Sequence, residues 1–197
     1  MFSAKTRDAI RPALFESFFV LLGVLLALGA NEWRQHEKDE DRVRTAKLSI
    51  LEEMRENRQA IATSHTYHAS LLQLLNTPHE EDWVPDTRTV FSKGFILPAN
   101  LYSTAWHSAS DTGILANMKY EDVLALSRIY ARQRRYEMMA DSVSGIIYQA
   151  LFEEGANAIG QNYHNLSAII SAFHYRETAL LAQYDQAIAQ AKQKKAQ

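Results

Sequence analysis

Two histidines three residues apart are the residues of this chain whose types and spacing best suit chemistry. His65 and His68 lie in a long segment with helical periodicity, where this spacing places both imidazoles on one helix face. Helical bundles build metal sites in this way, and Glu53, Glu56 or His164 are candidates for further ligands. A metal-dependent enzyme is therefore one hypothesis. The alternative is a polar break in a helix–helix seam, with His68 bonded to a partner helix, and no HExxH motif supports the metal site.

A second cluster, around Trp106, brings serine, histidine and aspartate together within residues 103–111. A catalytic triad needs groups that converge in space, and neighbours along a helix point in different directions. No G-x-S-x-G elbow is present. Trp106 as a core residue explains the cluster better, and we expect any ligand pocket of the domain beside Trp106 and Tyr130. A ligand-sensing domain is thus a second alternative, and we predict no catalytic residues, no bound metal and no cofactor.

Three arginines share one helical face at positions i, i+4 and i+7: Arg128, Arg132 and Arg135. The net charge of −2 and the pI near 6.4 argue against a nucleic-acid partner, because such patches usually accompany net basicity. We expect the arginines to be solvated or to pair with the glutamates of residues 52–56 across a helix contact.

The most apolar segment predicts a location. From Phe18 to Ala30 there is no charged or hydrogen-bonding side chain, and an extension back to Pro12 gives roughly 28 Å of helix, close to the ~30 Å hydrocarbon thickness of a bilayer. Trp33 would mark the far interface. We therefore predict an N-terminal tail and transmembrane anchor over residues 1–33 of a single-pass protein of the bacterial inner membrane, with the lipid bilayer as a partner. A cleaved signal peptide over residues 1–29 is the alternative.

The orientation of this anchor rests on the charges that flank it. Counting only Lys and Arg, residues 34–47 are the more basic flank, which favours a cytoplasmic domain. The net-charge contrast and the short basic tail before residue 12 favour a periplasmic domain instead. We expect the periplasmic side.

Small residues in the anchor suit close packing of like helices. Gly23 and Ala27 stand four apart, Ala30 extends the face by a turn, and Asn31 can add an interhelical hydrogen bond. The seam continues beyond the anchor, where Asn57 would set register. Self-association as a homo-oligomer or within a membrane complex is the expected result.

Hydrophobic periodicity predicts an all-α fold in which the anchor continues into a stalk helix that packs with two further long helices as an antiparallel bundle. The bundle domain covers residues 34–197. Its expected elements are a stalk helix at 34–76, an irregular loop at 77–98, short helices within 99–118, and long helices at 120–154 and 158–192.

Several short motifs lie along the chain: the stretch Leu26 to Trp33, then Leu51 to Glu53 and Asn57, then Trp106, Gly113, Leu115 and Met118, and Tyr130. Together they resemble a family of bacterial membrane proteins that have one N-terminal anchor and a helical domain of unknown function. The resemblance implies a bacterial envelope protein, and it gives no activity that could be carried over to this chain. The sequence as a whole favours a non-enzymatic scaffold or assembly component.

Overall fold

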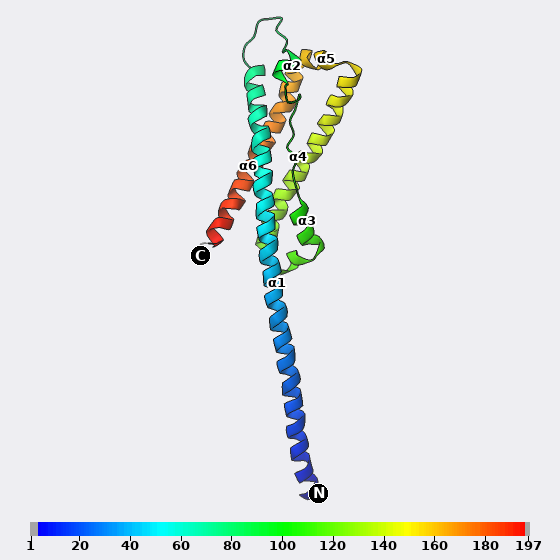
Figure 1. The fold of residues 1–197 in the computed structure, drawn as a ribbon, viewed down its shortest axis with the longest axis vertical. Helices are drawn as coiled ribbons and strands as arrows, with labels where there is room; N and C mark the ends of the chain where they lie inside the picture. The colour runs from blue at the N-terminus through cyan, green and yellow to red at the C-terminus, as the bar shows by residue number, and fades with distance from the viewer. Residues whose placement is uncertain (1–3, 196–197) are drawn as a thin grey trace. The chain divides into compact units, whose positions relative to one another are not determined.

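The structure is a computed structural model that describes the backbone of residues 4–195 and the side chains of residues 18–193. Within this part every regular element is helical and none is a strand (Figure 1). The elements are α1 (Ala4–Leu75), α2 (Thr87–Val90), α3 (Thr104–Asp111), the 3₁₀ helix η1 (Ile114–Asn117), α4 (Tyr120–Glu153), α5 (Ala156–Gln161) and α6 (Tyr163–Lys195). The all-α prediction is confirmed.

The chain divides into two compact units, residues 1–45 and 46–197, whereas the sequence predicted a boundary after Trp33. In the first unit the apolar side chains from Phe18 to Leu28 are exposed, Leu26 to 66%. The following charged turns form contacts within the helix, such as Arg44 with Asp41 at 3.0 Å. These i,i+3 and i,i+4 contacts support a helix that has little tertiary packing of its own.

The predicted membrane anchor is wrong. Among the residues that the structure describes, no helix has a stretch both long enough and apolar enough to cross a bilayer. The charge-free stretch Phe18–Ala30 is about 13 residues, and a span needs about 20. The polar residues Asn31 and Glu32 directly follow this stretch. The prediction extended it at its other end to residues 12–17, whose side chains lie outside the described residues. This finding contradicts the predicted single-pass inner-membrane localisation, its periplasmic side included.

In the second unit, α1 and α4 run in the same direction. Lys47 of α1 forms an ion pair with Asp122 at the start of α4, with Nζ and Oδ2 2.8 Å apart. Ten residues further along α1, Asn57 contacts Gln133 of α4 at 3.3 Å. The partners therefore advance together along both helices, which differs from the antiparallel arrangement predicted for the bundle. The reason is that the chain travels back along the unit between these helices before α4 begins (Figure 1).

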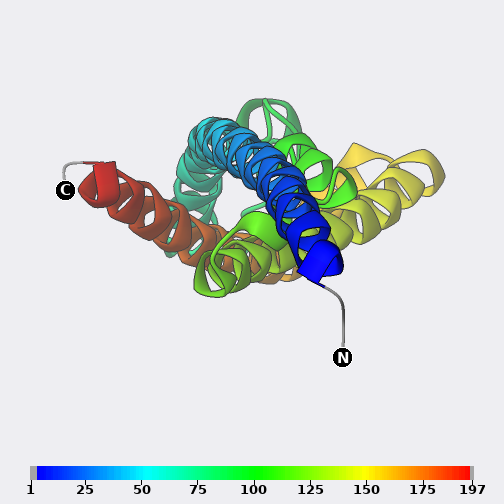
Figure 2. The same cartoon turned by 90° about the horizontal axis from the view of Figure 1, so that it is seen from below.

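Helix α6 is antiparallel to both α1 and α4. Arg58 of α1 binds Asp185 near the end of α6 at 2.5 Å, while Asn76, just after α1, accepts a hydrogen bond from Ser167 near the start of α6. Helices α4 and α6 cross, and their C-terminal ends point away from each other (Figure 2). Long helices packed together are thus present as predicted.

The return segment between α2 and α3 is extended over residues 96–103, where the sequence predicted short helices from residue 99. Two later turns of the chain contain a glycine with positive φ. Gly113 (φ 73°) precedes η1, and Gly155 (φ 84°) follows α4. The helix predicted at 158–192 begins earlier and is interrupted at Asn162, between α5 and α6.

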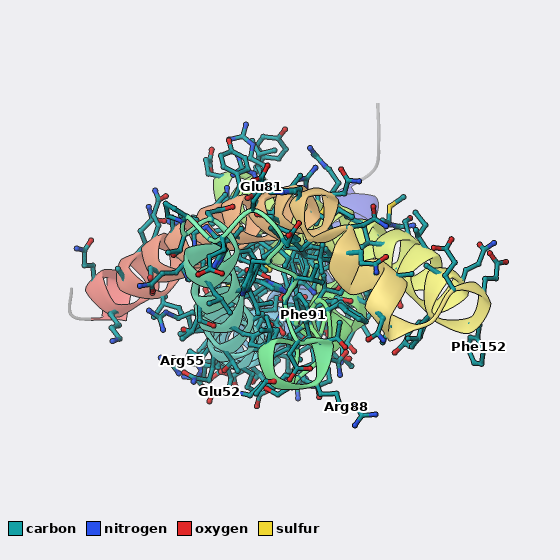
Figure 3. All side chains as sticks on the ribbon, turned by 90° about the horizontal axis from the view of Figure 1, so that it is seen from above. Glu52, Arg55, Glu81, Arg88, Phe91 and Phe152 are labelled. Carbon is teal, nitrogen blue, oxygen red and sulfur yellow. The ribbon has the colours of Figure 1, made fainter. Side chains whose placement is uncertain are left out.

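The core of the second unit consists of two apolar clusters. The larger one lies between α1, α4 and α6, and its fully buried side chains include Ile50, Met54 and Ile61 of α1, Tyr136 of α4, and Phe173, Leu180 and Tyr184 of α6. A smaller cluster at the other end surrounds Phe91, which lies near the middle of the unit in Figure 3, whereas Phe152 lies at its outer edge. The core leaves seven polar or charged residues buried among the apolar ones, and these form the candidate site.

Candidate functional site

The buried polar residues of α1 recur on the same stripe as its core residues. Glu53, Asn57, Ser64 and His68 are each at most 7% exposed. Helical spacing turns all four toward the interior of the unit. A buried polar group is costly unless it is hydrogen-bonded, so each of them needs a partner there.

His68 and Glu177 form the centre of this network, and both side chains are fully buried. His68 Nδ1 lies 2.9 Å and 3.0 Å from the two carboxylate oxygens of Glu177, and Nε2 accepts the backbone N–H of Leu97 at 3.0 Å. A backbone N–H can only donate, so Nε2 carries no proton and Nδ1 donates to Glu177. Tyr136 also donates to Glu177, at 2.9 Å. Both ring nitrogens of His68 are therefore occupied.

Glu53 forms the second anchoring point of the network. Its Oε1 accepts the Tyr130 hydroxyl at 2.6 Å, and its Oε2 accepts the backbone N–H of Ala105 at 2.7 Å. Burial, followed by the hydrogen bond to Glu53 and its charge, raises the pKa of the Tyr130 hydroxyl far above its usual range. Tyr130 therefore stays neutral and acts as a donor. Glu53 thus binds Tyr130 and Ala105, and the arginines of α4 are exposed, as in the solvated one of the two predicted alternatives.

Asn57 hydrogen-bonds to the backbone of the return segment in the same way as a residue of a neighbouring β-strand would. Its Oδ1 accepts the N–H of Tyr102 at 2.8 Å and its Nδ2 donates to the carbonyl of the same residue at 2.7 Å. Gln133 donates to that carbonyl at 3.0 Å and accepts from Tyr184 at 2.9 Å. The side-chain amide of Asn57 thus makes the two hydrogen bonds that a peptide group of a paired strand would make, and it holds the extended segment in place.

Together these side chains hold the return segment by its backbone. The N–H groups of Leu97, Ala99 and Tyr102 and the carbonyl of Tyr102 all bond to buried side chains of α1 and α4, and so does the N–H of Ala105 in the first turn of α3. The signal available in the sequence was the polar residues within the apolar stripe of α1. A helix face that packs only against another helix does not need hydrogen-bond donors and acceptors at that spacing, so these polar residues indicate a non-helical neighbour.

His65, the other member of the predicted pair, lies outside this network. Its ring stacks on His174 of α6 with centroids 4.1 Å apart, and its Nε2 lies 3.0 Å from Thr178 Oγ1. Burial, and next the neighbouring His174, lowers the pKa of His65, although the charge of Glu177 opposes the shift. No group of three or more histidine or acidic side chains in the described part of the chain is placed to hold a metal ion.

Trp106 and Tyr130, proposed as pocket residues, stack face to face with centroids 5.1 Å apart and planes inclined by 16°. Tyr130 is buried and Trp106 half-buried, so the two rings fill space against each other. Two depressions of the described surface, of about 420 and 450 Å³, are lined by other residues.

Gly23, the first residue of the predicted small-residue face, has open space around it. A Cβ atom added there meets no atom within 4 Å, and Ala27, Ala30 and Asn31 are exposed. None of the described side chains of the first unit, residues 18–45, buries these four residues.

No protein-family model, no curated protein and no solved structure matches this chain. The resemblance to bacterial envelope proteins therefore stays a prediction.

The His68–Glu177 contact gives a test of the network. Replacing His68 by leucine roughly preserves volume but leaves the Leu97 N–H without a partner and leaves the buried Glu177 carboxylate with only the Tyr136 hydroxyl as a donor. We expect the free energy of unfolding to fall by about 3 kcal/mol, as when one partner of a buried pair is removed. Chemical denaturation measures the loss, and His107→Leu is the control because His107 is exposed and should cost less than about 0.5 kcal/mol. Equal losses in the two variants would contradict the assignment.

The stacked histidines make stability depend on pH. The pKa of His65 lies below its usual 6.5 in the folded chain, so the unfolded chain binds more protons between the two values. The free energy of unfolding must then fall as the pH decreases through that window. In denaturation series between about pH 8 and about pH 5, His65→Gln should depend less on pH than the native chain. His107→Gln, the control, should keep the native slope, and a native slope in His65→Gln would refute the explanation.

Proposed function

We propose that this protein is a non-enzymatic assembly component in which residues 18–30 of α1 join like chains and carry the helical domain of residues 46–197 into the assembly. The observation that carries the proposal is the exposure of a long apolar stretch. Metal chemistry at His65 and His68 has less support, because His68 is fully engaged and His65 stacks on another ring.

The apolar side chains of the first unit point in every direction around α1. Phe19, Val20 and Leu21 are consecutive, so they occupy different faces of the helix, and each is at least 58% exposed. A helix that is apolar on all sides is a buried helix in its working state. Copies of the same segment offer a surface of matching length and chemistry, and several copies together cover more than one face.

The charges next to this segment allow identical chains to lie side by side. Residues 32–44 hold five acidic and four basic side chains, so opposite charges nearly balance. Several are already in contact within the helix, including His36 with Glu40 and Arg42 with Asp39. A balanced segment of this kind does not repel its own copy, unlike a block of like charge.

A carboxylate placed in the apolar segment tests the proposal. Leu26→Glu should weaken self-association about 100-fold, because assembly would bury an unpaired charge. Leu48→Glu is the matched control: it makes the same change on the same helix, and Leu48 is exposed to 56% against 66% for Leu26. Light scattering over a range of protein concentrations gives the mass. A native chain that stays monomeric, or variants that behave alike, would refute the proposal.

The small-residue face predicts which side of α1 makes the closest approach. Gly23→Leu should weaken assembly about tenfold by holding helices apart. Gly29→Leu adds the same side chain about 240° around the helix and should have little effect. A Cβ atom added at either position meets no atom within 4 Å, so we expect the isolated chain to tolerate both changes. Sedimentation velocity distinguishes the two, and an equal effect of both would exclude this face.

A further inference from the structure

The outer side of α4 carries one regular stripe that the proposed function does not use. Its members follow each other at alternating steps of four and three residues, the repeat of a helix that packs along another helix. Seven of the eight side chains are exposed and Met139 is half-buried. The stripe consists of Arg128, Arg132, Arg135, Met139, Ser142, Ile146, Gln149 and Glu153.

The chemistry of the stripe changes along its length. Its first part is cationic, and among the described side chains the ion pairs of the second unit involve residues other than these three arginines. Its middle is apolar or small, with Ile146 exposed to 64%. Its end is acidic, where Glu153 accepts a hydrogen bond from Gln149 at 3.0 Å.

The stripe is complementary in charge to a second copy of itself only when that copy runs in the opposite direction. A parallel copy would place arginine against arginine, which is unfavourable. An antiparallel copy places Arg128 opposite Glu153 and Arg132 opposite Gln149. The remaining arginine, Arg135, then lies over the exposed Ile146, where its aliphatic stem can cover apolar surface while the guanidinium reaches water.

We propose that α4 is a second, independent interface, through which two copies of the chain pair antiparallel about a twofold axis between Met139 and Ser142. The occupant is a copy of the chain because the face is self-complementary, as a twofold interface requires. The twofold axis produces the contact between Arg128 and Glu153 twice. A single charge reversal therefore creates two repulsive contacts.

Charge reversal tests the pairing. Arg128→Glu and Glu153→Arg should each weaken pairing about tenfold, since each places like charges together at both ends. An equimolar mixture of the two variants should pair again, because both contacts between the unlike chains are then attractive. The chain carrying both changes should pair as well. Reversals without effect, or a mixture that does not pair, would overturn the proposal.

A cysteine placed near the axis supplies a local readout. The chain contains no cysteine, so a disulfide formed by Ser142→Cys can join only two copies. We expect this variant to form dimers on mild oxidation, and the control Tyr175→Cys, exposed to 75% on α6, not to do so. Equal cross-linking of both would count against α4.

The full chain is used throughout, with and without Leu26→Glu. If assembly through residues 18–30 fails and α4 pairing is real, the Ser142→Cys disulfide and the rescue by mixing persist in both backgrounds. If only the N-terminal assembly exists, Leu26→Glu weakens all association about 100-fold and charge reversal changes nothing. Circular dichroism of each variant verifies the fold, which exposed substitutions should leave intact.

Discussion

The arrangement of the second unit depends on how it hydrogen-bonds an extended segment inside a helical core. Because α1 and α4 run in the same direction, the chain must return along the unit between them, and residues 96–103 do so without helical hydrogen bonds of their own. Each buried backbone group left without a partner would cost about 1–3 kcal/mol. Buried side chains on α1 and α4 supply those partners, among them Asn57 on α1.

This constraint explains why the interior contains ionisable groups at all. Glu177 is fully buried and is stabilised by donors from His68 and Tyr136 rather than by a cationic side chain. His68 in turn uses its second nitrogen to hold Leu97, so one chain of hydrogen bonds links α6, α1 and the return segment. Buried polar groups of this kind favour one packing arrangement over others, because any shift in register leaves several of them unsatisfied.

The surfaces of the two units contrast with this satisfied interior. The first unit exposes apolar side chains around α1, and α4 exposes a stripe whose charges run from basic to acidic. In both places the partner that we propose is a second copy of the chain. The acidic residue Glu52 of α1 pairs with its own neighbour Arg55, and these two lie together at the edge of the unit in Figure 3, so they leave the arginines of α4 available for such a contact.

The sequence by itself determined the helical class and the approximate extent of the long helices, because periodic apolar residues and helix-breaking glycines act locally. It also indicated that His68 was a polar break in a seam. Only the tertiary structure shows the partners of these histidines. His68 faces the interior and binds Glu177, whereas His65, three residues away, lies at the margin of the core and stacks on His174. The direction of α4 and the extended course of residues 99–103 likewise depend on contacts between distant residues. The membrane prediction failed because a local apolar run does not establish a span of sufficient length.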